Sequence, residues 1–162
     1  MRKSTLMLLF CFLYFCAYGQ EQSSIDTLIK KYAKENKVDE KVIHAIVKIE
    51  SNYNPKAVGA DTVKDTDLTD INGYSYGLMQ IKYGTAKVVG FTGKLKELFR
   101  PEINLKYGIK YLAYCLEMFK GNLNQALDAY NRGPLNVQLH PYKGKWENHR
   151  YVGKVLAVLS TL

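Results

Sequence analysis

A glutamate stands at the end of an apolar helical stripe, where a charged side chain is unusual. In the stretch AIVKIESNYNPKAVG, residues 45–59, Glu50 follows Ile43 by seven positions and Ile46 by four, so the three share a helix face. The helix must end just beyond, because the residue before Pro55 disfavours the α conformation. Burial and the negative end of the helix dipole would raise the pKa of the Glu50 carboxyl. Such an acid can protonate a leaving sugar oxygen, whereas a glutamate turned to solvent needs no function.

The sequence contains three short motifs in order, and the first of them begins at Glu50. They are Glu50-Ser51-Asn52-Tyr53-Asn54-Pro55, then Gly77-Leu78-Met79-Gln80-Ile81, then Ala129-Tyr130-Asn131-Arg132-Gly133-Pro134, with a trailing Glu147 and Tyr151-Val152. In this order they resemble the catalytic domain of the soluble lytic transglycosylase family, which is related in fold to goose-type lysozyme. The resemblance extends over residues 25–159. It implies an all-α, lysozyme-like single domain with a long polar loop after the catalytic helix.

The resemblance also implies a reaction and a substrate. That family cleaves the β-1,4 bond between N-acetylmuramic acid and N-acetylglucosamine in peptidoglycan, and its sole catalytic acid corresponds to Glu50. The glutamate protonates the glycosidic oxygen and then takes the proton of the muramyl C6 hydroxyl, which closes onto C1 and leaves a 1,6-anhydro end. This reaction needs no second carboxylate, unlike ordinary glycoside hydrolysis. It also implies no cofactor and no metal.

Eight other residues are the predicted substrate-binding positions: Ser51, Gly77, Met79, Gln80, Tyr130, Asn131, Glu147 and Tyr151. By resemblance, Gln80 hydrogen-bonds the sugar, the Tyr130 hydroxyl approaches the catalytic carboxyl, and Asn131 fixes the adjacent turn. Gly77 would let the backbone approach the sugar closely. Met79 suits a core position as well as the sugar site. Glu147 equally suits a helix N-terminus, and Ser51 and Tyr151 equally suit packing roles.

The segment between the first two motifs departs from the family pattern. It is longer than in many relatives, and Gly59 stands where a serine is common, so a hydroxyl for the substrate acetamido group is missing or comes from Ser75. Its acidic residues are Asp61, Asp65, Asp67 and Asp70. They suggest calcium binding, but DTDLTDING lacks the glycine and the terminal glutamate of an EF-hand loop. We therefore predict no metal site there.

Two other functions are compatible with these residues. A goose-type-lysozyme-like muramidase would use Glu50 with water as the attacking group, and Asp61 or Asp70 would have to activate that water. A non-catalytic wall-binding accessory of a secretion or conjugation system would keep the groove alone. Against the second, a pure binder has no reason to bury an acid.

Helical periodicity dominates the chain after residue 20 and would position the motifs. Ser24 is the predicted N-cap of a first helix and Asp39 of the helix that carries Glu50. A short helix is predicted to end at Gly90, a long one to run from Pro101 to Gly121, one to begin at Asn122 with Gln125 and end at Gly133-Pro134, and a last one to cover residues 147–159. No strand alternation and no internal repeat is evident.

The N-terminal residues have the pattern of a signal peptide. A basic MRKST precedes the apolar LMLLFCFLYFCAYG, which is short for a membrane span, and Ala17-Tyr18-Gly19 predicts cleavage before Gln20. An uncleaved N-terminal anchor is the alternative. We expect a signal peptide over residues 1–19 and one catalytic domain over residues 20–162. The protein would then be exported to the periplasm or cell envelope.

Charge and cysteine usage agree with an exported wall protein. The formal net charge of +8 would fall to +6 on cleavage, because residues 1–19 hold Arg2, Lys3 and no acid. A basic exported protein suits a polyanionic partner such as a bacterial cell wall, and no nucleic-acid recognition motif is present. We predict a monomer, with secretion or conjugation machinery as a further candidate partner. After cleavage Cys115 would be the remaining cysteine, on an apolar helix face that suits a small buried hydrophobe.

Overall fold

The structure, a computed structural model, describes residues 23–60 and 73–162 and is mostly helical over that part of the chain, as predicted. Residues 23–36 are helical, and the next helices are α2 (Glu40–Ser51), α3 (Tyr83–Val88), α4 (Pro101–Met118), α5 (Leu123–Arg132), α6 (Pro134–Leu139) and α7 (Val152–Leu159). The other elements are two 3-10 turns, η1 (Leu95–Phe99) and η2 (Trp146–Asn148), and the strands β1 (Val58–Ala60), β2 (Tyr74–Tyr76) and β3 (Ile81–Lys82). None of the helices in the described part is both long and apolar enough to cross a membrane.

Most helix ends follow local signals in the sequence. The Asp39 side chain accepts a hydrogen bond from Lys41 N at 2.9 Å and caps α2, as predicted. Asn122 caps α5 in the same way, by accepting from Gln125 N at 3.1 Å. Pro101 is the first residue of α4, where its missing N–H costs no hydrogen bond.

The end of α4 is a paired turn of the Schellman type. Gly121 N donates to Leu116 O at 2.8 Å and Lys120 N donates to Glu117 O at 3.1 Å. Gly121 therefore ends the helix, as predicted, although Lys120 holds the left-handed position, with φ 52°, that glycine usually fills.

Two helix starts differ from the sequence predictions. Ser24 is already helical, so it is not the N-cap of the first helix. The last helix begins at Val152 and not near residue 147, because residues 146–148 form η2 and the chain turns at His149 before α7. In addition, α6 follows Gly133 directly and was not predicted, since six residues are too few to show a helical period.

A small antiparallel sheet is the main feature that the sequence does not predict. Its strands lie in the order β1-β2-β3, with Gly59 opposite Ser75 and Tyr76 opposite Ile81. Each strand has three residues or fewer, which is too short for alternation to be recognised. Most of the predicted polar loop, residues 61–72, lies outside the described residues.

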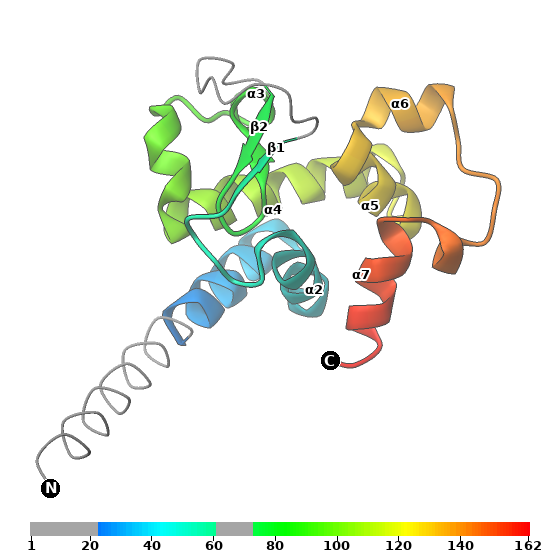
Figure 1. Cartoon of the computed structure of the whole chain (residues 1–162), viewed down its shortest axis with the longest axis horizontal. Coiled ribbons are helices and arrows are strands. Elements are labelled where there is room, and N and C mark those ends of the chain that lie inside the picture. The colour runs from blue at the N-terminus through cyan, green and yellow to red at the C-terminus, as the bar shows by residue number, and fades with distance from the viewer. Residues whose placement is uncertain (1–22, 61–72) are drawn as a thin grey trace, which may run out of the picture.

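Helix α4 is the central element of the fold and packs on both hydrophobic clusters. Figure 1 shows it crossing the middle of the molecule, with residues 23–36 and α2 on one side and the sheet and α3 on the other. Its Leu112 belongs to an aliphatic cluster with α2 and α7. Its Tyr111 and Cys115 belong to a second, more aromatic cluster with the sheet and α5. Cys115 is fully buried, as predicted.

Candidate active site

A cleft of about 560 Å³ opens beside the C-terminal end of α2. One wall comes from the sheet and α3, and the other from α4, α5 and the start of α6. The lining residues are Glu50, Ser75, Gln80, Ile81, Lys82, Thr85, Tyr111, Tyr130, Asn131, Arg132, Gly133 and Asn136. Among these described residues Glu50 is the one carboxylate.

Glu50 is the penultimate residue of α2 and is half-buried. The helix ends because Asn52 adopts a left-handed conformation with φ 50°, and Pro55 follows. The Tyr151 hydroxyl donates a hydrogen bond to Glu50 Oε1 at 2.7 Å. Since α2 packs against α7, this contact joins residues 101 positions apart in the sequence. The catalytic carboxyl predicted from the sequence therefore lies at a helix end, in a cleft, with a phenol bound to it.

Two tyrosine hydroxyls lie near Glu50 and do different things. Burial raises the pKa of both Tyr130 and Tyr151 well above the ordinary value, and the Glu50 carboxylate raises it further. Both therefore remain protonated donors. By resemblance the Tyr130 hydroxyl approaches the carboxyl, and the charge of Glu50 does act on it. The hydrogen bond to Glu50 Oε1 at 2.7 Å comes from Tyr151. The Tyr130 hydroxyl donates instead to Met79 O at 2.7 Å.

The sheet wall is organised around the side-chain amide of Gln80. Its Nε2 donates to Gly77 O at 2.8 Å and Ala57 O at 3.1 Å, and its Oε1 accepts from the Ser75 hydroxyl at 2.8 Å. A Cβ at Gly59 would lie 2.8 Å from Ser75 Oγ. It would lie still closer, at 2.5 Å, to Gln80 Oε1, so any side chain at position 59 would displace the Ser75 and Gln80 pair.

A buried asparagine anchors the turn between β2 and β3. Asn104 of α4 is fully buried; its Oδ1 accepts from Met79 N at 2.8 Å, and its Nδ2 donates to Tyr76 O and Leu98 O, both at 2.7 Å. Gly77 has φ 71°, and any Cβ there would collide with the Asn104 amide. The close approach at Gly77 is thus to α4.

A buried carboxylate anchors the α5 wall. Asp128 is fully buried, and Arg132 binds it in a bidentate pair, Nε to Oδ1 at 2.6 Å and Nη2 to Oδ2 at 2.7 Å. His149 Nε2 lies 3.2 Å from Asp128 Oδ1. The hydrogen bond to Asp128 raises the pKa of Arg132. Arg132 also donates to His140 O at 2.8 Å and lines the cleft, so the pair joins the cleft to the turn before α7.

The predicted site residues fall into three groups. Glu50, Gln80, Tyr130 and Asn131 line the cleft, and Tyr151 reaches it through Glu50. Three lie behind its wall: Gly77; Met79, whose buried side chain packs on Gly108; and Ser51, whose hydroxyl donates to Leu78 O at 2.8 Å. Glu147 is exposed on η2 and is not among the lining residues.

Several site residues were missed by sequence reasoning. Lys82, Thr85, Tyr111, Arg132 and Asn136 also line the cleft. The Asp128 and Arg132 pair has the i, i+4 spacing of a helix ion pair, which was a usable signal. Among the described residues no three histidine, cysteine, aspartate or glutamate side chains gather as a metal site would require.

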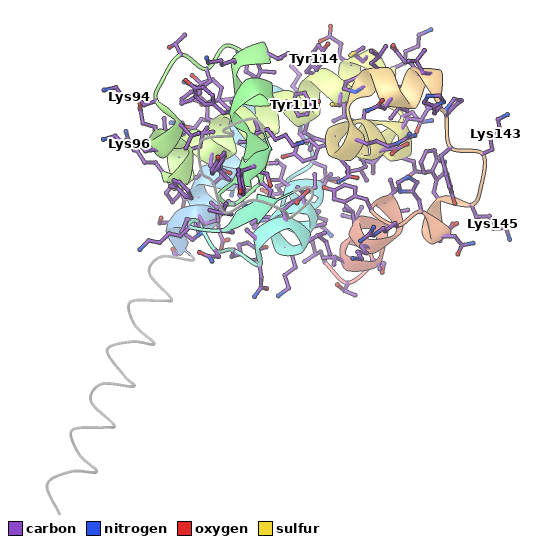
Figure 2. All side chains as sticks on the ribbon, turned by 45° about the horizontal axis from the view of Figure 1, so that its top comes forward. Lys94, Lys96, Tyr111, Tyr114, Lys143 and Lys145 are labelled. Atoms are coloured by element: carbon purple, nitrogen blue, oxygen red, sulfur yellow. The ribbon has the colours of Figure 1, made fainter. Side chains whose placement is uncertain are left out.

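A row of tyrosine rings leads away from the Glu50 end of the cleft. The ring centroids of Tyr130 and Tyr111 are 5.6 Å apart, and those of Tyr111 and Tyr114 are 6.1 Å apart and stacked. Tyr111 and Tyr114 line an adjoining hollow of about 600 Å³. Figure 2 shows these two side chains in the upper part of the view, between Lys94 and Lys96 at the left edge and Lys143 and Lys145 at the right edge.

Comparisons with known proteins agree with this geometry. Residues 27–151 match the family described as "Transglycosylase SLT domain". Over 120 residues the chain is 32% identical to the soluble lytic murein transglycosylase of Escherichia coli, an alignment that covers 68% of this chain and 16% of that relative. It is 30% identical over 127 residues to the membrane-bound lytic murein transglycosylase E of Buchnera aphidicola, covering 70% of this chain and 52% of that one.

Solved structures give the same relationship. An inactive glutamate-to-glutamine variant of the lytic transglycosylase Slt from Pseudomonas aeruginosa superposes with a TM-score of 0.65 and 26% identity, over 82% of this chain and 23% of that one. The 70-kDa soluble lytic transglycosylase of Escherichia coli superposes with a TM-score of 0.63 and 27% identity, over 83% and 23%. This chain thus spans less than a quarter of these larger proteins. By its family match and its fold, the chain belongs to the transglycosylase SLT domain family.

Proposed function

We propose that this protein is a lytic transglycosylase that cleaves the β-1,4 bond between N-acetylmuramic acid and N-acetylglucosamine in peptidoglycan. The observation that carries the proposal is the position of Glu50, the one carboxylate among the described residues that line the cleft. Inverting and retaining hydrolysis both use a second carboxyl near the first, at about 5–10 Å. A reaction with one acid and an internal nucleophile fits the described walls better.

In the proposed reaction Glu50 acts first as an acid and then as a base. It gives its proton to the glycosidic oxygen, the C1–O bond breaks, and the N-acetylglucosamine leaves with a free 4-hydroxyl. The C6 hydroxyl of the muramyl sugar then bonds to C1, and its proton passes to Glu50. The nucleophile is tethered to the reacting sugar, so its effective concentration is high without help from the protein. No water is consumed, and the enzyme returns to its starting state.

The walls of the cleft support a sugar substrate. The tyrosine rings offer flat apolar faces with polar edges, and Ser75, Asn131 and Arg132 offer hydrogen-bonding groups nearby. The Ser75 hydroxyl lies opposite Gly59 on the neighbouring strand and is our candidate for contact with the substrate acetamido group. The names of the relatives, and the inactive glutamate-to-glutamine variant, point to the same reaction.

Two measurements test the proposal. Glu50→Gln keeps the side-chain shape and removes the transferable proton, so release of muropeptides should fall by at least about a hundredfold, the low end for loss of general acid catalysis. Glu40→Gln, an exposed glutamate at the other end of α2, is the matched control and should stay active. Normal turnover by a folded Glu50→Gln protein would refute the assignment.

The mass of the products identifies the reaction. Digestion of purified peptidoglycan should release anhydro muropeptides, which lie one water, about 18 mass units, below hydrolysed ones because water is not the attacking group. Hydrated reducing ends that disappear in Asp61→Asn or Asp70→Asn would instead establish a muramidase. Binding of glycan strands without any cleavage would favour the accessory role.

Location and assembly are proposed on the sequence. We infer export to the periplasm or cell envelope, with removal of residues 1–19, from the basic and apolar N-terminal pattern. N-terminal sequencing of the protein recovered from the envelope should begin at Gln20, and a start at Met1 would support the uncleaved anchor.

We further propose that the protein is a monomer, which sedimentation would test. We also propose that secretion or conjugation machinery is a partner, which crosslinking in cells would test.

A further inference from the structure

The turn before α7 is capped by a histidine side chain. His149 has extended backbone angles, φ −70° and ψ 127°, and its carbonyl accepts the helix-type hydrogen bond from Gly153 N at 2.8 Å. Its Nδ1 accepts from the backbone N–H groups of Tyr151 at 3.3 Å and Val152 at 3.2 Å. These are the two roles of an N-cap residue, which is usually Ser, Thr, Asp or Asn.

This cap requires one tautomer of the imidazole. Nδ1 must offer a lone pair to the N–H groups of Tyr151 and Val152, so the ring proton is on Nε2. Nε2 lies 3.2 Å from Asp128 Oδ1, which is fully buried and can accept that proton's hydrogen bond. A carboxylate at that distance favours the ring proton on Nε2, which is the tautomer that the cap needs.

The orientation of the ring is restricted from several sides. Tyr142 packs edge-on against His149 with centroids 4.7 Å apart, and Trp146 lies at 5.7 Å. Asp128 is itself fixed by the bidentate pair with Arg132. The ring can neither flip nor move away without losing these contacts.

The capped turn holds Tyr151, whose hydroxyl is hydrogen-bonded to the proposed catalytic acid. One of the two capped N–H groups belongs to Tyr151, and the Tyr151 hydroxyl donates a hydrogen bond to Glu50 Oε1 at 2.7 Å. Its ring is buried in the aliphatic cluster, so the direction of its side chain follows the direction of its backbone. A shift of the turn would therefore move the hydroxyl away from Glu50.

We propose that Asp128 and His149 are positioning residues of the active site, which hold the Tyr151 hydroxyl on Glu50 by fixing the backbone of the turn before α7. The inference rests on the proposed function, because Glu50 must be the acid for the position of Tyr151 to matter. Neither residue touches the substrate in this proposal. They act through Tyr151, and their effect should vanish when its hydroxyl is absent.

The ring tautomer can be measured without any activity. Long-range ¹H–¹⁵N NMR spectra of the histidine rings at neutral pH should show His149 protonated on Nε2 and bare at Nδ1. The same result is expected in Glu50→Gln, which separates this test from the proposed reaction. A His149 ring protonated on Nδ1 would overturn the inference.

Kinetics on soluble glycan strands of defined length test the role in catalysis. His149→Ala should lower kcat about tenfold, the effect of losing one well-placed hydrogen bond at the reacting group, with KM nearly unchanged. His149→Asn restores an acceptor near the position of Nδ1 and should recover most of the loss. His140→Ala removes an exposed histidine ring from the same region and is the matched control.

A double-mutant cycle distinguishes positioning from general damage. Tyr151→Phe removes the hydroxyl alone, and adding His149→Ala to it should lower kcat no further than about twofold. Multiplying losses in the double variant, or an unchanged kcat in a folded His149→Ala protein, would overturn the inference. If Glu50→Gln were also fully active, the proposed function would be what failed.

Discussion

The two fully buried polar side chains of the described chain, Asn104 and Asp128, anchor opposite walls of the cleft by different means. Asn104 is neutral and bonds only to main chain, at Met79 N, Tyr76 O and Leu98 O. Asp128 accepts two hydrogen bonds from the Arg132 guanidinium, and His149 Nε2 lies 3.2 Å from its Oδ1. The first anchor fixes the turn that lines the sheet wall, and the second fixes a turn that reaches Glu50 from the other side.

The difference shows how a fold can combine a rigid wall with one that depends on charge. An amide bonded to three backbone groups has no ionisable partner, so the sheet wall should hold its geometry over a wide pH range. An ion pair needs every partner in its correct protonation state. Changes on the Asp128 side should therefore alter catalysis beyond their effect on stability, and changes on the Asn104 side should mainly alter stability.

The isosteric change Asn104→Asp should have the largest effect on stability. The new carboxyl would be buried beside two carbonyl oxygens, Tyr76 O and Leu98 O, with no donor for them. We expect a loss of about 3–5 kcal/mol at pH 7, the range for a buried uncompensated charge. The loss should shrink as pH falls toward 4, because a protonated carboxyl can donate again. Urea unfolding at several pH values would check this.

The reverse change, Asp128→Asn, should cost less. It leaves Arg132 without its carboxylate, but 31% of the Arg132 side chain is exposed and can be hydrated. We expect a loss of about 1–3 kcal/mol, below the full penalty for breaking a buried pair. If Asp128→Asn were the more destabilising of the two swaps, the contrast between the two anchors would be refuted.

The buried phenol of Tyr130 extends the comparison of the two walls to high pH. Tyr130 donates to Met79 O on the sheet wall, and Tyr130→Phe should cost about 1–2 kcal/mol at pH 7 by leaving that carbonyl unpaired. Since burial raises its pKa well above the unfolded value of about 10, the stability it contributes is complete below pH 10 and is lost as pH rises further. The difference between wild type and Tyr130→Phe should thus narrow above pH 10. A constant difference in denaturation experiments from pH 7 to 11 would contradict this.

The smallest effect is expected at Cys115 of α4, which lies between Asn104 and Asp128 in the sequence. Burial raises the pKa of its thiol to about 12, so almost no thiolate is present at pH 8. Iodoacetamide should leave the folded protein unmodified for hours and modify it within minutes in urea, as followed by mass spectrometry. Comparable rates in both conditions would mean that α4 opens readily, and that neither anchor is rigid.

Local signals made the helices predictable, and long-range pairing hid the sheet. Asp39 and Asn122 cap their helices through atoms two or three residues away, so a short sequence window contains the whole interaction. β1 and β2 are instead separated in the sequence by residues 61–73, and only their pairing places Gly59 opposite Ser75. A short sequence window therefore contains no signal of this strand pairing.

The position of the candidate acid in the cleft could be predicted from the sequence, and the contacts that depend on helix docking could not. Glu50 follows from its helix face and from the motif that begins with it. Which tyrosine bonds to it does not, because Tyr130 and Tyr151 are both buried phenols near the carboxylate and only the docking of α7 decides. His149 was missed because histidine is not among the residues that signal a helix cap.

The bond between Tyr151 and Glu50 also has a consequence for how the enzyme comes into being. It closes a span of 101 residues, and contacts of high sequence separation form slowly, because chain entropy must be lost before they stabilise anything. A nascent or partly folded chain carries the glutamate but lacks the phenol beside it. If the proposed activity is correct, a chain in which α7 has not yet docked lacks this contact, and full activity is expected only when folding is complete.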